Sequence, residues 1–116
     1  MAWKIEKSDF FDNRFRKFEK KHPAEAVAVL NNLDTYFRAL SEGVNPLQIK
    51  VGFIHHEPEG IKAIDQKGGK GNLMQTRLYI FPDMAKEILH VISIGTKQDQ
   101  SGDISECRQY IKPLKT

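Results

Sequence analysis

The period at which apolar residues recur changes at Pro46, and this change limits the fold more than any other feature of the sequence. Between Ala26 and Val44, apolar residues are spaced four and three apart, which is the period of one helix face. From Leu47 to Phe53 they alternate with other residues, which is the period of a half-buried strand. A chain that is helical before Pro46 and extended after it belongs to the α+β class, in which helices cover one face of an antiparallel sheet.

One short strand and two helices are expected in the first part of the chain. Apolar and charged residues alternate at 2–7, which predicts the strand. A helix is predicted at about 8–21, with Ser8 at its start and three phenylalanines spaced four and three apart on one face. Pro23 is tolerated in a first helical turn and opens a second helix at 23–42. We expect the two helices to pack as an antiparallel hairpin.

Four strand-like segments and a last helix are expected after the hairpin. The segments are 47–57, 61–64, 73–81 and 88–94, and they are separated by turns at 58–60, 67–71 and 82–83 that contain glycine or proline. Consecutive strands with short connections are antiparallel neighbours by default.

The tail is predicted to form a short C-terminal helix. Asp103 and Glu106 have the spacing of a capping box, and apolar residues follow at helical spacing up to Ile111. The fold class is therefore α+β, with an N-terminal strand, a two-helix antiparallel hairpin, an antiparallel sheet and a short C-terminal helix, all in one domain at 1–116.

Composition excludes several classes of protein. The chain has 116 residues, of which 40% are hydrophobic and 28% charged, which excludes a disordered tail or a collagen-like repeat. No apolar run approaches the ~20 residues needed to cross a bilayer. Charges at 1–7 stand where a signal peptide needs apolar residues, and the single cysteine, Cys107, cannot form an internal disulfide, so we expect a cytoplasmic protein. Eighteen basic and fifteen acidic residues give a net charge of +3, which permits nucleic-acid binding without demanding it.

The strand at 73–81 is the most informative candidate for a functional surface. Its apolar face is expected to pack on the helix hairpin, so the opposite face carries Gln75, Arg77, Tyr79 and Phe81. This second face is either an ordinary solvated back of the sheet, covered by cross-strand pairs, or a ligand surface.

The loop at 66–72 places Lys67 and Lys70 among three glycines. Glycines allow backbone N–H groups to approach a phosphate, and the ammonium groups add positive charge. It is not a phosphate-binding loop of the Walker type, since no serine or threonine follows the Gly-Lys pair and no helix follows the loop. A flexible hairpin connection kept soluble by lysine explains the loop equally well.

The histidines and the cysteine give weaker signals. Neighbouring residues on a strand point to opposite faces, so His55 and His56 are not expected to chelate one metal ion. Either ring could act as a general base near a phosphate. His90 and Cys107 lie on apolar stripes and are expected to be packed in the interior.

The order of elements and three short motifs resemble the RelE/ParE-type toxin superfamily, small basic proteins of bacterial toxin–antitoxin pairs. The motifs are Arg77-Leu78-Tyr79, Ile94-Gly95-Thr96-Lys97 and Tyr110 near the C-terminus, and the resemblance spans about 2–111. The RelE-like branch cleaves messenger RNA inside the translating ribosome, whereas the ParE-like branch inhibits DNA gyrase. The segment 89–97 is similar to the last core strand and following loop of RelE-like members, which favours that branch.

The resemblance implies RNA cleavage without a metal ion or cofactor, in which the 2′-hydroxyl attacks the adjacent phosphate. Arg77 would stabilise charge on the phosphorane, Lys97 would neutralise the same phosphate, and Tyr110 would stack on a base or move a proton. Lys62 and Lys67 are candidates for the base or for substrate grip. The expected catalytic residues are Arg77, Lys97, Tyr110 and Lys67, and the expected substrate-binding residues are Lys62, Lys70, Gln75, Tyr79 and Arg108. The hypothesis requires these groups to converge on one shallow concave surface.

Two other functions remain open on the sequence. The first is a non-catalytic binder, either a ParE-like gyrase inhibitor or an inactive toxin homologue. The second is a small-ligand domain that uses the region of His55 and His56. For a toxin, the expected partners are the ribosome, messenger RNA and a cognate antitoxin that is acidic and partly disordered until it binds.

Overall fold

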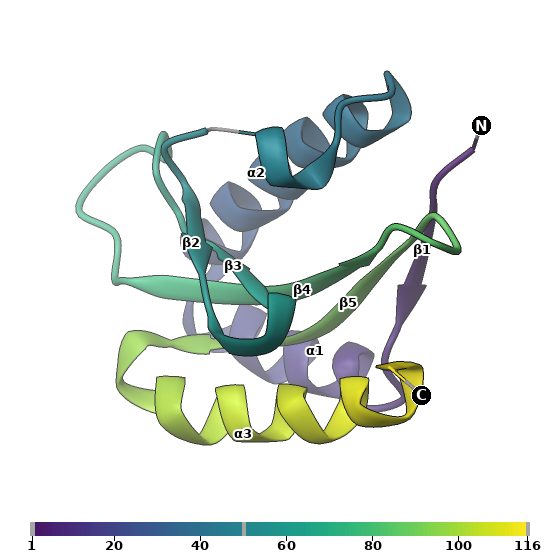
Figure 1. Cartoon of the computed structure of the whole chain (residues 1–116). Coiled ribbons are helices and arrows are strands. Elements are labelled where there is room, and N and C mark those ends of the chain that lie inside the picture. The colour runs from purple at the N-terminus through teal and green to yellow at the C-terminus, as the bar shows by residue number, and fades with distance from the viewer. Residues whose placement is uncertain (1, 50, 116) are drawn as a thin grey trace.

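The computed structural model describes residues 2–49 and 51–115, and it is an α+β fold with two hydrophobic cores on the two faces of one sheet. Two helices, α1 (Phe11–Lys21) and α2 (Pro23–Ser41), form the predicted hairpin against one face. A third helix, α3 (Gln100–Ile111), covers the other face. In Figure 1 the central strands of the sheet run between α2 above and α3 below. None of these helices is long and apolar enough to cross a membrane within the described part of the chain.

The sheet has five strands in the order β1-β5-β4-β3-β2. Their bounds are β1 Lys4–Lys7, β2 Ile54–His56, β3 Lys62–Ile64, β4 Thr76–Asp83 and β5 Ile88–Thr96. All neighbouring pairs are antiparallel except β1 and β5, which are parallel. The predicted strand, hairpin and sheet are confirmed.

A β-bulge lies between β4 and β5. Tyr79 pairs with Ser93, but the next residue, Ile80, pairs with Val91, so Ile92 is an extra residue on β5. Ile92 packs on the α3 side, while Val91 just before it and Ile94 two residues after it pack against the hairpin.

The first helix begins later than predicted. Ser8 does not cap it: the Ser8 hydroxyl donates to the Ile92 carbonyl at 2.7 Å, and the Ser8 backbone N–H donates to the Val91 carbonyl. Ser8 thus prolongs the β1–β5 contact, and α1 starts only at Phe11.

The long strand predicted at 47–57 is wrong for most of its length. The Asn45 side chain accepts a hydrogen bond from the Leu47 backbone, and this turn starts a short 3₁₀ helix at Pro46–Gln48. Residue 50 lies outside the described residues, and only Ile54–His56 pairs with the sheet.

The last helix begins before its predicted capping box. The capping box is formed by Thr96 and Asp99, around a 3₁₀ turn at Lys97–Asp99 that leads into α3. Asp103 instead points inward, where its carboxylate lies 3.7 Å from the Arg14 guanidinium. The helix α3 covers most of the sheet face that was expected to be open, so the expectation of a solvated back is wrong, and a ligand surface is left at the end where Gln75 is exposed.

Candidate functional site

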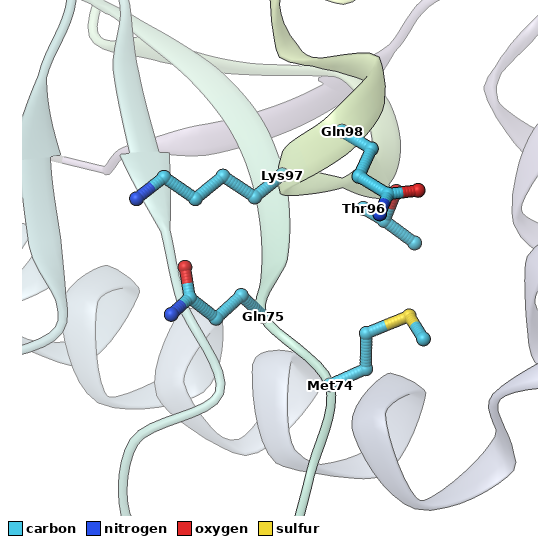
Figure 2. Close-up of a pocket in the computed structure, with 5 residues that line it drawn as sticks. All are labelled: Met74, Gln75, Thr96, Lys97 and Gln98. Carbon is cyan, nitrogen blue, oxygen red and sulfur yellow. The ribbon is translucent and has the colours of Figure 1, made fainter.

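An open pocket lies where the first residues of β4 meet the last residues of β5. It is lined by Met74, Gln75, Thr96, Lys97 and Gln98. The Lys97 backbone N–H donates to the Gln75 carbonyl at 3.0 Å, which fixes the two residues side by side. Figure 2 shows the Lys97 and Gln75 side chains extending in the same direction, away from Met74, Thr96 and Gln98.

The Lys97 ammonium is a free cation at this pocket. Its side chain is exposed, and no carboxylate forms an ion pair with it among residues 2–49 and 51–115. Lys97 is also the first residue of the 3₁₀ turn that Thr96 and Asp99 cap, so its backbone is well fixed. An unpaired ammonium on a fixed backbone is suited to binding an anionic group such as a phosphate.

Arg77 lies one residue from the pocket, on the sheet face that α3 covers. It is 7% exposed, and its Nη1 donates to the Thr76 carbonyl at 3.0 Å. Its Nε finds no hydrogen-bond partner in the described part of the chain. A guanidinium keeps its charge at every physiological pH, so this incompletely bonded cation adds positive potential beside Lys97.

The residue opposite Arg77 is Gly95, and only a glycine fits there. A Cβ atom at Gly95 would lie 2.2 Å from Asp103 Oδ2, which is the carboxylate of the first full turn of α3. Burial, more than the opposing effect of Arg14, raises the pKa of Asp103 to about 6. The start of α3 therefore packs tightly on β5 beside the pocket and does not cover Lys97.

Tyr110 does not join this site. Its hydroxyl lies 3.1 Å from His90 Nδ1, and His90 pairs with Phe81, four residues along β4 from Arg77. Four strand residues separate the two positions by about 13 Å. The expected convergence of Arg77 and Tyr110 is wrong, because α3 runs the length of the strands and carries Tyr110 to their far end. Burial raises the pKa of Tyr110 and lowers that of His90.

Arg108 and Tyr79 are also removed from the pocket. Arg108 is ion-paired with Glu59, near the far end of α3. Tyr79 is fully buried under α3, its hydroxyl has no partner within the described residues, and burial raises its pKa. Substrate cannot touch Tyr79 unless α3 moves.

The remaining predicted lysines are divided between two places. Lys62 is buried on the hairpin side of β3, its Nζ lies 3.0 Å from His56 Nδ1, and burial lowers its pKa. Lys67 and Lys70 are exposed in the glycine-rich loop, where Lys67 Nζ donates to the Gly52 carbonyl at 2.9 Å. The Asn32 side chain donates to the carbonyls of Asp65 and Lys67 and ties this loop to α2.

The sequence interpretation missed one polar pair. His55 Nε2 lies 2.7 Å from Asp65 Oδ2, and Asp65 is 3% exposed. The sequence did contain a signal for this pair. Asp65 is a carboxylate directly after a buried strand, and it lies ten residues from His55 on the preceding strand. No group of three or more histidine, cysteine or acidic side chains is arranged to bind a metal ion within the described ranges.

Comparison of the structure with solved structures shows which known fold it shares. No family model and no curated protein matches the sequence. One solved structure matches with a TM-score of 0.60: the Escherichia coli toxin RelE in the free state, in a variant with two arginines replaced by alanine. The fold is that of RelE. The two chains are 18% identical, and the match covers 96% of this chain and 99% of the RelE chain.

Proposed function

We propose that the protein is the toxin of a type II toxin–antitoxin pair and that it cleaves messenger RNA on the ribosome. The RelE fold over 96% of the chain supports the toxin assignment. The observation that carries the RNA-cleaving activity is the pairing of a free Lys97 ammonium with the incompletely bonded Arg77 guanidinium, at an open end of the sheet.

The two cations are suited to stabilise the cleavage reaction. When a 2′-hydroxyl attacks the adjacent phosphate, negative charge develops on the non-bridging oxygens of the phosphorane. Fixed positive groups that face this charge typically contribute 10²–10³-fold to the rate. Lys97 is placed to bind the phosphate directly, and Gln75 beside it is placed to donate a hydrogen bond to a phosphate or a base edge. The buried Arg77 adds positive charge from beneath the pocket.

The proposed site is smaller than the sequence suggested. Lys97, Arg77 and Gln75 remain in it, because β-sheet pairing brings them together. Tyr110, Arg108, Tyr79 and Lys62 do not, because each is bonded or buried elsewhere. Lys67 and Lys70 remain candidates for contacts with more distant phosphates, since both are exposed.

An antitoxin is the proposed protein partner. The net charge of +3 favours an acidic segment, and the outer surface of α2 exposes Val27 and Leu30 as apolar contacts. A partly disordered segment that folds along such a surface could also cover the Lys97 pocket and silence the toxin.

The test is expression in a bacterial host followed by primer extension on cellular messenger RNA. Wild-type protein should arrest growth and produce cuts within translated messages, and Lys97→Ala should lose most of both effects. Lys86→Ala is the matched control, since Lys86 is exposed in the turn at the opposite end of β4 and β5. Equal toxicity and equal cutting by folded Lys97→Ala protein would remove the basis of the proposal.

A non-catalytic binder is the second candidate, and the separation of Tyr110 from Arg77 favours it. A toxin that inhibits DNA gyrase needs a recognition surface and not a set of proton-transfer groups. Growth arrest with a DNA-damage response, and with no cuts in messenger RNA, would establish this candidate.

A further inference from the structure

A second polar cluster lies beside Arg77, on strands β2 and β3. His55 Nε2 is 2.7 Å from Asp65 Oδ2. The Asp65 side chain is 4% exposed, whereas the His55 side chain is 36% exposed. A ring that reaches solvent is therefore oriented by a carboxylate that does not.

The hydrogen bonds of Asp65 decide which nitrogen of the His55 ring is free. Asp65 Oδ1 accepts the Lys67 backbone N–H at 2.8 Å, and Oδ2 faces the His55 ring. An ionised carboxylate only accepts hydrogen bonds, so Nε2 carries the hydrogen and Nδ1 of the neutral ring keeps its lone pair. Nδ1 has no partner among residues 2–49 and 51–115 and is free to accept a proton.

Strand register places this pair on the same sheet face as Arg77. His55 pairs with Ala63, and Ala63 pairs with Tyr79 in the core under α3. Asp65 is the residue after the last β3–β4 pair, Ile64 with Leu78, and extending this register by one position places it opposite Arg77. Because side chains alternate along strands, His55, Asp65 and Arg77 share one face. The His55 backbone is two strands, about 10 Å, from β4, and its side chain is turned toward Asp65.

The other three histidines do not have this geometry. His56 points to the hairpin face, where it contacts the Lys62 ammonium at 3.0 Å. His90 is 2% exposed and contacts Tyr110, and His22 packs against Phe18 at the junction of α1 and α2. Among these four histidines, His55 alone combines an oriented ring, exposure and a place on the sheet face that carries Arg77.

We infer that His55, oriented by Asp65, is the general base of the RNA cleavage, an inference that rests on the proposed function. His55 Nδ1 takes the proton of the ribose 2′-hydroxyl, and the 2′-oxygen attacks the adjacent phosphorus. The bond from phosphorus to the 5′-oxygen breaks, and this oxygen leaves with the bonding pair and takes a proton from solvent water. The products are a 2′,3′-cyclic phosphate and a 5′-hydroxyl, and the imidazolium returns its proton to the hydroxide that remains. Lys97 faces the phosphate oxygens during this step, and the buried Arg77 guanidinium adds positive potential from beneath the pocket.

The experiment measures single-turnover cleavage of a defined messenger RNA on programmed ribosomes. His55→Gln is expected to reduce the rate 10²–10⁴-fold, the range for loss of a positioned base. His56→Gln is the matched control, since it makes the same change one residue away on the opposite face, and it should stay within about threefold of wild type. Circular dichroism and thermal unfolding confirm that each variant is folded.

Two further measurements separate a base from a merely structural residue. Added imidazole should restore at least tenfold of the lost rate in His55→Gly and nothing in Lys97→Ala, because only the first variant lacks a proton acceptor. The ¹⁵N shifts of the His55 ring should show the hydrogen on Nε2 in wild type, and Asp65→Asn should change this pattern and lower the cleavage rate.

The outcomes distinguish the inference from the function on which it rests. If wild type cleaves and His55→Gln cleaves as fast as His56→Gln, the inference is overturned and the proposed function stands. If wild type itself leaves the RNA intact, the proposed function fails and the inference fails with it.

Discussion

The two ends of the sheet face that α3 covers are built from the same two strands but differ in what their polar side chains can reach. At one end, Lys97 and Gln75 are exposed, and Arg77 Nε has no hydrogen-bond partner in the part of the chain that the structure describes. At the other end, Tyr110 on the last turn of α3 is hydrogen-bonded to His90 on β5. The contrast teaches that chemistry on this face is limited by the helix that covers it, more than by the strand residues themselves.

In the comparison of the two ends, the largest expected effect comes from removing the Arg77 guanidinium at the open end. Arg77→Ala should reduce RNA cleavage 10²–10³-fold, because it deletes a fixed positive charge beneath the place where the phosphorane forms. The protein should stay folded, since within residues 2–49 and 51–115 the Arg77 side chain makes one hydrogen bond, to the neighbouring Thr76 carbonyl. Cleavage assays beside Arg38→Ala, an exposed residue of α2 paired with Asp34, measure the effect. An equal loss of cleavage in both variants would mean that the net charge of the protein, and not the position of Arg77 at the open end, determines the rate.

The next prediction concerns the closed end, which is the end of the covered sheet face where Tyr110 contacts His90. Ile111→Ala should lower the free energy of unfolding by about 3 kcal/mol, because Ile111 is 1% exposed in the core under α3. Urea denaturation measures the change. Faster hydrogen exchange confined to α3 and the Tyr110 end of β5 would show that the two ends open separately, whereas uniform exchange would show one cooperative unit.

A smaller effect concerns pH at the boundary between the two ends. Burial raises the pKa of Asp103 to about 6, so the folded state binds this proton more tightly than the unfolded state. Stability from this group is therefore present at low pH and is lost as pH rises through about 6. Between pH 5 and pH 7, the difference in unfolding free energy between wild type and Asp103→Asn should fall by about 1 kcal/mol. A difference that is constant across this range would contradict the assignment.

The smallest effect is expected from Tyr110→Phe. Loss of its hydrogen bond to His90 should cost about 1 kcal/mol or less of stability and should leave RNA cleavage unchanged. Cleavage that falls tenfold or more in the folded variant would mean that the closed end opens during the reaction.

Sequence patterns predicted the elements well where the signal is local. The periods of 3.6 and 2 located both hairpin helices and the two longest strands, β4 and β5, because each element repeats its pattern over several turns or residues. The prediction of a strand after Pro46 was wrong, although apolar residues alternate there. The Asn45 side chain accepts a hydrogen bond from the Leu47 backbone N–H, and the chain forms a turn at this point.

The site was predictable only where neighbouring strands create it. Gln75, Arg77 and Lys97 meet through the β4–β5 register, which follows from consecutive antiparallel strands. The position of Tyr110 depends on how Cys107 and Ile111 pack α3 onto the sheet. The direction in which α3 crosses the sheet cannot be predicted from the spacing of residues along the chain. The His55–Asp65 pair depends on the register of two short edge strands, and this register is equally invisible to spacing.

The extra residue at Ile92 has a consequence for how such a chain can vary. Deleting one residue there would turn the remainder of β5 over, so that Ile94 would leave the hairpin core and Gly95 would no longer face Asp103. The cation at position 97 would then emerge on the far side of the sheet from His55. Homologous chains that lose the bulge would have to rebuild their phosphate contacts from different residues, even while every helix and strand stayed in place.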